Sequence, residues 1–147
     1  MDTQKNIWTQ NISLDILNET SKNTLIEHLE IVYVDISERT ISATMPVKSI
    51  THQPLGMLHG GASVVLAETL GSVAANFSVP DGHYAVGLDI NANHVRAMRS
   101  GLVKGIAEPL HLGATTQVWQ INIVDERNRL VCTSRLTVAV MKRKKSD

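Results

Sequence analysis

The chain of 147 residues has the length of one ordinary domain, and its 43% apolar content is enough to build a single core without disulfides or metals. Its 14 basic and 14 acidic residues balance, so no sequence-wide field draws it to nucleic acid or to an anionic membrane. Any anionic ligand must therefore be held by a local site. The single cysteine, Cys132, cannot form an internal disulfide, and its alternating apolar surroundings predict a small core residue.

The start of the chain is polar. Residues 1–10 lack the basic beginning and apolar run of a secretory signal, and no stretch reaches the roughly 20 apolar residues that cross a bilayer. We therefore expect a cytoplasmic protein with no membrane partner. The expected organisation is one domain over residues 1–147, with flexible ends at about 1–10 and 142–147.

The first half of the chain contains short elements. Residues 11–28 carry scattered apolar side chains and predict short helical turns. Two β-branched runs, residues 31–36 and 40–47, are separated by a polar stretch and predict a hairpin. Residues 51–60 have no period and include a proline and a glycine, so they are predicted to form a loop.

The segment from Gly61 to Ser78 is the only long helical candidate, and Glu68 is its sole charged residue. At about 100° per residue, one side of this helix carries larger apolar side chains, and the side with Glu68 carries small or apolar ones. The first side comprises Leu66, Leu70, Val73 and Phe77, and the second comprises Gly61, Val64, Val65, Gly71, Ser72 and Ala75. Because a helix without a charged solvent face is normally buried, we expect it to be covered on nearly all sides.

Four strand-like stretches follow a turn at Pro80-Asp81-Gly82. They are residues 84–96, 102–108, 117–125 and 130–141, with apolar residues at alternate positions. Short turns between them indicate antiparallel neighbours. The order of two strands, one buried helix and four strands predicts an α+β fold, in which one antiparallel β-sheet wraps around one long central α-helix.

The carboxylate of Glu68 on this apolar helix needs a partner or a purpose, because an unpaired buried charge is costly. A salt bridge is one explanation, and a catalytic role is the other. The helix begins at Leu58-His59-Gly60-Gly61, and a helix start offers unpaired N–H donors that suit a developing oxyanion. Gly60 and Glu68 stand about 12 Å apart on one straight helix, so they cannot both touch one carbonyl. This spacing predicts a dimer with antiparallel central helices and two shared sites.

The string His59-Gly60-Gly61-Ala62-Ser63, followed by Leu66-Ala67-Glu68-Thr69 and Gly71-Ser72, resembles the acyl-CoA thioesterases of the hotdog superfamily. The resemblance is closest to the branch that includes the phenylacetate-pathway and hydroxybenzoyl-CoA thioesterases with a catalytic Glu. Within it, residues 53–72, 86–96 and 109–113 are similar to the dihydroxynaphthoyl-CoA thioesterases of menaquinone synthesis. The proofreading thioesterases of enterobactin synthesis are near relatives, and the similarity covers nearly the whole chain.

This resemblance implies hydrolysis of an acyl-CoA to a free acid and CoA, with no cofactor and no metal. It implies Glu68 as nucleophile or general base and the Gly60 amide as donor to the carbonyl. His59 and Gln53 are implied as hydrogen-bonding partners near the thioester, and Ser72 as a helper one helical turn from Glu68. The substrate and its CoA arm are expected along Gly87, His94, Val95, Arg96, Ala97, His111, Leu112, Gly113, Ala114, Thr115 and Thr116. The family also implies that homodimers pair into a homotetramer.

The sequence leaves the substrate and two other functions open. An α/β-hydrolase is excluded because no Gly-x-Ser-x-Gly elbow is present, and a zinc site is unsupported because the six histidines show no paired spacing on a helix. A hotdog hydratase or dehydratase and a non-catalytic module that binds acyl-CoA or an aromatic ligand remain as alternatives. Aliphatic residues such as Met57, Val64 and Val65 are expected to line the acyl pocket, which suits an aromatic ring or a medium chain. The resemblance favours an aromatic acyl-CoA.

Overall fold

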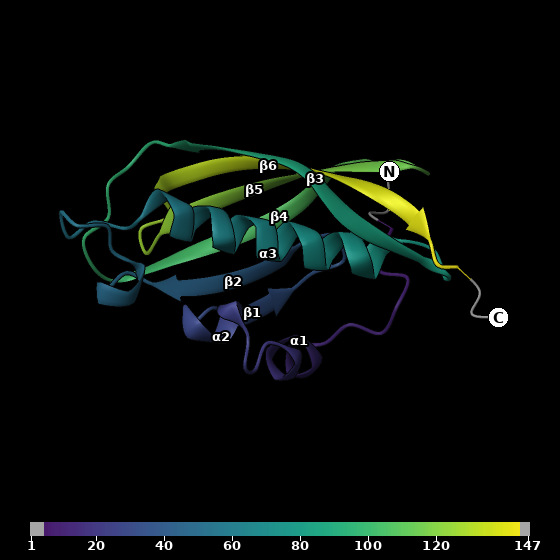
Figure 1. The fold of residues 1–147 in the computed structure, drawn as a ribbon, viewed down its shortest axis with the longest axis horizontal. Helices are drawn as coiled ribbons and strands as arrows, with labels where there is room; N and C mark the ends of the chain where they lie inside the picture. The colour runs from purple at the N-terminus through teal and green to yellow at the C-terminus, as the bar shows by residue number, and fades with distance from the viewer. Residues whose placement is uncertain (1–4, 145–147) are drawn as a thin grey trace.

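The computed structural model describes residues 5–144, in which one antiparallel sheet curves around a long helix (Figure 1). Residues 1–4 and 145–147, which belong to the ends expected to be flexible, lie outside the described residues. In chain order the elements are α1 (Leu14–Thr20), α2 (Leu25–His28), β1 (Val32–Ile36), β2 (Ile41–Pro46), the 3-10 helix η1 (Ser49–Thr51), α3 (Gly60–Ser78), β3 (His83–His94), β4 (Leu102–Leu112), β5 (Thr116–Asp125) and β6 (Leu130–Lys142).

The six strands form one sheet in the order β1-β2-β4-β5-β6-β3, and all neighbouring strands are antiparallel. Strand β5 shows how the alternating pattern becomes a core, because Trp119, Ile121 and Ile123 are fully buried while the residues between them are partly exposed. The α+β prediction, with one sheet around one helix, is therefore confirmed. Strand β4 runs four residues beyond the predicted Glu108, since the register shift after Pro109 lets the sheet accommodate that proline.

Two glycines, one in the sheet and one in α3 itself, let the helix pack closely against the inner face of the sheet. Leu66 and Leu70 are fully buried, and they lie against Gly105 of β4, where a Cβ atom would stand 2.6 Å from Leu70 Cδ1. A Cβ atom on Gly71 would likewise stand 2.7 Å from Leu136 Cδ2 of β6. The sequence-based assignment of Gly71 to the Glu68 side of the helix is therefore wrong, because this glycine allows close contact with the sheet.

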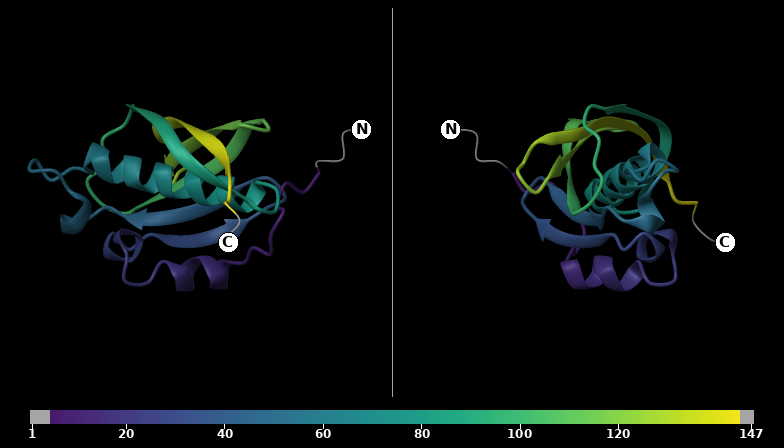
Figure 2. Two further views of the ribbon diagram at one scale, coloured as in Figure 1. Left: turned by 45° about the vertical axis from the view of Figure 1, so that its right-hand side comes forward. Right: turned by 90° about the vertical axis from the view of Figure 1, so that its left-hand side faces the viewer.

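One side of α3 is left uncovered by the rest of residues 5–144. Gly61 and Glu68 are exposed, and Val64, Val65 and Ser72 are only partly buried. Figure 2 shows the sheet curving around α3 without enclosing it. The expectation that the helix is covered on nearly all sides is thus wrong for the single chain. We call these five residues the open stripe of α3.

The N-terminal segment packs along the outside of this core. Ile7 and Thr9 donate backbone hydrogen bonds to Glu38 and Phe77, and the Trp8 indole donates to the carbonyl of Ser37 at 2.7 Å. The Trp8 ring also stacks on Trp119, with ring centroids 6.4 Å apart. Within residues 5–144, no helix has both the length and the apolar character needed to span a membrane.

Candidate active site

The first turn of α3 has one N–H group without a partner among the described residues. His59 is the N-cap, and its ring Nδ1 accepts from the Gly61 N–H at 2.8 Å. The N–H groups of Ala62 and Ser63 donate to the His59 carbonyl at 3.0 and 3.2 Å. Among contacts within residues 5–144, the Gly60 N–H alone in this turn has no acceptor, and it lies at the positive end of the helix dipole.

Gly60 borders a cleft of about 420 Å³ at this end of the helix. The lining comprises Gln53, Met57, Leu58, Gly60, Ser63, His94, Val95, Arg96, Ala97 and Val131. A Cβ atom on Gly60 would stand 3.0 Å from His94 Nε2, so the His94 ring lies directly over the helix start. The structure therefore brings together two candidate catalytic residues, Gln53 and Gly60, with the candidate CoA-binding residues 94–97.

Two polar side chains beside this helix start have defined hydrogen-bonding states. Because His59 Nδ1 accepts a hydrogen bond, the neutral ring carries its hydrogen on Nε2, and His59 itself is exposed. The Gln53 side-chain oxygen accepts from the Leu55 N–H, which leaves the Gln53 amino group as a donor. Each side chain therefore keeps a hydrogen-bond donor that its own local contacts do not use.

Glu68 lies in a second hollow, of about 370 Å³, near the middle of α3. Its carboxylate is exposed and forms no hydrogen bond or ion pair with any residue in the described range 5–144. Ser72, one turn further along the helix, lines the same hollow. Gly87 of β3 faces Glu68, since a Cβ atom there would stand 3.3 Å from Glu68 Oε1. This glycine lets the carboxylate approach the strand closely.

The other segment expected to bind CoA, residues 111–116, lies at the opposite end of the molecule. This turn joins β4 to β5, and the Thr115 carbonyl accepts from Val140 at the end of β6. The next residue, Gln117, donates to Ser78 Oγ at the last position of α3 at 3.2 Å. Helix α3 has 19 residues, which is about 28 Å of length. One chain therefore does not bring residues 111–116 together with residues 94–97.

Within residues 5–144, the groups with displaced pKa values are not among the side chains that line these two clefts. Burial raises the pKa of Tyr33 to about 12, and burial also raises the pKa of the Cys132 thiol. Cys132 is fully buried, as expected for a core residue, and is therefore a poor nucleophile. Hydrogen bonds from Arg129 and Arg127 lower the pKa of Asp125 in the β5–β6 turn. Within residues 5–144, no cluster of three or more His, Cys, Asp or Glu side chains could hold a metal ion.

Sequence reasoning missed the side of the Glu68 hollow that α2 forms. Leu25 and Ile26 line it together with Val65, Thr69 and Val73 of α3. Of the three residues expected in an acyl pocket, only Val65 lies here, while Met57 lines the cleft beside Gly60. The only sequence signal for α2 was the adjacent apolar pair Leu25 and Ile26 after a polar stretch. Such a pair does not show which part of the protein its side chains contact.

A sheet wrapped around one long helix defines the hotdog class of fold, and comparisons identify the family. Residues 55–132 match the thioesterase superfamily. A Vibrio cholerae protein designated a candidate esterase is 75% identical over 91% of this chain and 89% of its own length. The 1,4-dihydroxy-2-naphthoyl-CoA hydrolase of Escherichia coli is 52% identical over 92% of this chain and 99% of its own length. A thioesterase of Haemophilus influenzae, known from its crystal structure, is 47% identical, with a TM-score of 0.92 over 95% of this chain and 97% of that chain.

The chain therefore belongs to the thioesterase superfamily. The resemblance inferred from the string around Gly60 and Glu68 is confirmed at the level of family and fold. Residues 55–132 contain both positions.

Proposed function

We propose that the protein hydrolyses the thioester of an aromatic acyl-CoA, with the Glu68 carboxylate acting on the carbonyl that the Gly60 N–H polarises. The observation that carries this proposal is the Gly60 N–H, the one group in the first turn of α3 that has no acceptor within the described part of the chain. Its three neighbours in that turn are all occupied, so the helix start presents one donor at one defined place. A donor aimed at the developing oxyanion is a large contribution to acyl transfer.

The chemistry needs few groups because a thiolate leaves readily. In one route Glu68 attacks the acyl carbon, the carbon–sulfur bond breaks, and water hydrolyses the mixed anhydride. In the other, Glu68 takes a proton from water, which attacks the same carbon and expels the CoA thiolate. His59 and Gln53 donate hydrogen bonds near the carbonyl in both routes. The residues present serve either route.

The proposed site is shared between two copies of the chain. Gly60 and Glu68 are about 12 Å apart on α3, so the carboxylate must come from a partner helix that runs antiparallel. The open stripe of α3 is free to receive it.

Strand β3 is one of the two edge strands of the sheet, with Val86 and Leu88 exposed, and an unpaired edge of this kind is a template for another strand. An antiparallel partner also brings its own residues 111–116 towards residues 94–97. We extend the proposal to a homotetramer by analogy with the family.

The substrate proposal rests on the relatives and on the Glu68 hollow. The Escherichia coli relative is named a 1,4-dihydroxy-2-naphthoyl-CoA hydrolase. Together with the resemblance to the thioesterases of menaquinone synthesis, this name favours an aromatic acyl-CoA of that kind. The hollow beside Glu68 is mostly apolar and about 370 Å³ in volume, at the small end of ligand pockets. It suits an aromatic ring or a medium acyl chain, and we favour the aromatic group.

Thiol release from a panel of acyl-CoAs tests the function. We expect wild-type protein to release CoA from dihydroxynaphthoyl-, benzoyl- and fatty acyl-CoA, and Glu68→Gln to lower kcat by about 10²–10⁴-fold because the base or nucleophile is lost. Circular dichroism checks that the variant folds. Cys132 is buried, so the native protein adds little to the thiol signal.

Each alternative function has its own signature in this assay. A binding module would take up the acyl-CoAs without releasing thiol, and a hydratase would hydrate an enoyl-CoA while leaving the thioester intact. Thiol release that is undiminished in folded Glu68→Gln would overturn the assignment of Glu68.

A further inference from the structure

We propose that α2 forms the outer wall of the acyl-binding cleft and that Leu25 and Ile26 set which acyl groups fit beside Glu68. This inference rests on the proposed function and names the residues that select its substrate. Leu25 and Ile26 line one side of the 370 Å³ hollow, and Val65, Thr69 and Val73 of α3 line the other. Glu68 of α3 lines the same hollow, so an acyl group that occupies the hollow beside the carboxylate contacts Leu25 and Ile26 of α2.

The exposure of Leu25 fits this role. Its side chain is 55% exposed, although the residue begins a helix that is held against the body of the protein. A single exposed leucine needs no explanation on its own. Here, however, it belongs to a group of apolar side chains that converge on an unpaired carboxylate. That combination of apolar walls and one polar group is typical of a ligand site.

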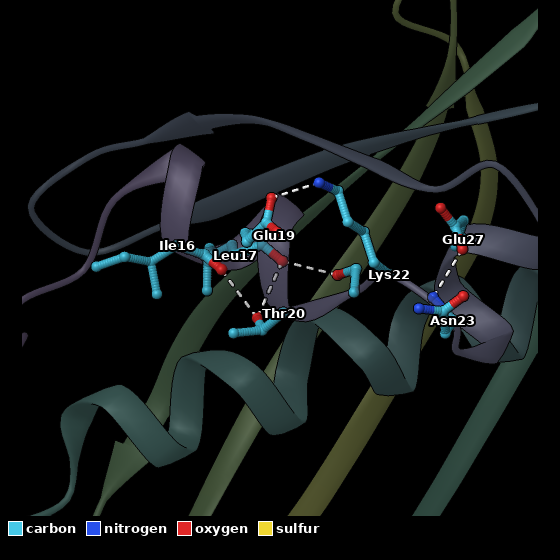
Figure 3. A network of polar contacts seen from close by, with 8 residues as sticks. Ile16, Leu17, Glu19, Thr20, Lys22, Asn23 and Glu27 are labelled. Carbon is cyan, nitrogen blue, oxygen red and sulfur yellow. Dashed lines mark hydrogen bonds and ion pairs between the residues drawn. The ribbon is translucent and has the colours of Figure 1, made fainter.

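The wall is fixed in place by local hydrogen bonds, which Figure 3 shows in part. A helix of four residues is not stable alone, so its position depends on its caps. The Thr24 side chain accepts from the Ile26 N–H at 3.2 Å, and the Glu27 carboxylate accepts from the Asn23 N–H at 2.7 Å. Thr24 also donates to the Ser21 carbonyl. The buried Leu29 then ties the end of α2 to the core. A wall held in this way can discriminate by size.

The volume of the Glu68 hollow indicates which part of the substrate it can hold. The Glu68 hollow, at about 370 Å³, has room for an acyl group and none for the whole CoA ester. Its lining is apolar apart from Glu68 and the hydroxyls of Thr69 and Ser72. The polar CoA arm must therefore lie outside it, and selection at α2 acts on the acyl group alone.

Substitutions in α2 test this by changing substrate ratios. We measure kcat/KM of Leu25→Trp, Leu25→Ala and Ile26→Ala for acetyl-, benzoyl-, naphthoyl- and octanoyl-CoA. We expect Leu25→Trp to lower the ratio of naphthoyl- to acetyl-CoA hydrolysis by about tenfold or more, and the alanine variants to raise it. Ile16→Trp is the matched control, because Ile16 is 37% exposed on the neighbouring α1 and lies outside the Glu68 hollow. We expect Ile16→Trp to keep the wild-type ratios.

The outcomes separate this inference from the proposed function. If Glu68→Gln abolishes thiol release and all three α2 variants keep the wild-type ratios, α2 is not the wall and this inference fails alone. If folded Glu68→Gln retains full activity, Glu68 is not the catalytic residue, and the proposed site fails together with this inference. Leu25→Ala removes atoms from an exposed side chain, so it keeps the test decisive if Leu25→Trp does not fold.

Discussion

The backbone N–H of Gly60, and not a side chain, is proposed to polarise the substrate carbonyl. Replacing it with proline removes the N–H, and the local conformation allows this change. Position 60 is the first of the helix, where proline is favoured, and His59 has φ −68° and ψ 130°, which suits a residue before proline. We expect Gly60→Pro to lower kcat by about 10²–10³-fold, as loss of an oxyanion donor does.

Gly60→Ala is the matched control for this substitution. Its Cβ atom meets the same His94 ring at 3.0 Å, but alanine keeps the N–H. We expect Gly60→Ala to retain most of the activity, and circular dichroism to report the same helix content for both variants. Equal losses in the two variants would assign the effect to crowding of His94 and would remove the amide from the mechanism.

The choice between Gly60 and Gly61 shows what the sequence could provide at this scale. The glycine pair after His59 predicted a helix start with accessible donors. Which donor is free depends on the His59 ring, which turns back to accept from Gly61. A rotamer of this kind is selected by the folded structure. The resemblance named Gly60, and the hydrogen bonds supply the physical reason.

At the scale of elements, the contact between α3 and β4 depends on the absence of a side chain at Gly105. A Cβ atom there would stand 2.6 Å from Leu70 Cδ1 and 3.2 Å from Leu66 Cγ, and both leucines are fully buried. We expect Gly105→Ala to lower the free energy of unfolding by about 1–3 kcal/mol, because an overpacked core must shift to relieve the contact. Denaturant unfolding at fixed protein concentration measures the change.

Shortening Leu70 provides the control. In the double variant Gly105→Ala, Leu70→Val, the crowded Cδ1 atom is gone, so the loss should be smaller than the sum of the two single losses. Strictly additive losses would show that Gly105 is needed for another reason.

The sequence predicted where the elements lie in the chain better than it predicted which side of each element is buried. Periodicity located α3 within one residue, since a stretch of 19 residues gives many repeats of the pattern. The same pattern placed Gly71 on the wrong side, because glycine carries no hydropathy that separates close packing from an open surface. Helix α2 has four residues, too few for any period, so its part in the Glu68 hollow appeared only in the structure.

At the scale of the whole molecule, the predicted CoA-binding segments are separated in a way that the sequence does not encode. Residues 94–97 and 111–116 are close in the chain, yet strand β4 carries the second segment away to the far end of α3. Long strands and their register decide such placement. The 12 Å spacing within one helix, in contrast, follows from helix geometry alone, which is why a shared site could be inferred without coordinates.

A shared site predicts that two defective chains restore one another. In a heterodimer of Glu68→Gln and Gly60→Pro, one site receives both defects, and the other pairs an intact Gly60 amide with an intact Glu68 carboxylate. We expect heterodimers isolated with two different affinity tags to show about half of the wild-type kcat, since one of two sites works. Each homodimer keeps only its low residual activity. If Gly60 and Glu68 served the same site from one chain, every site in the heterodimer would carry one defect, and activity would stay at the level of the parents.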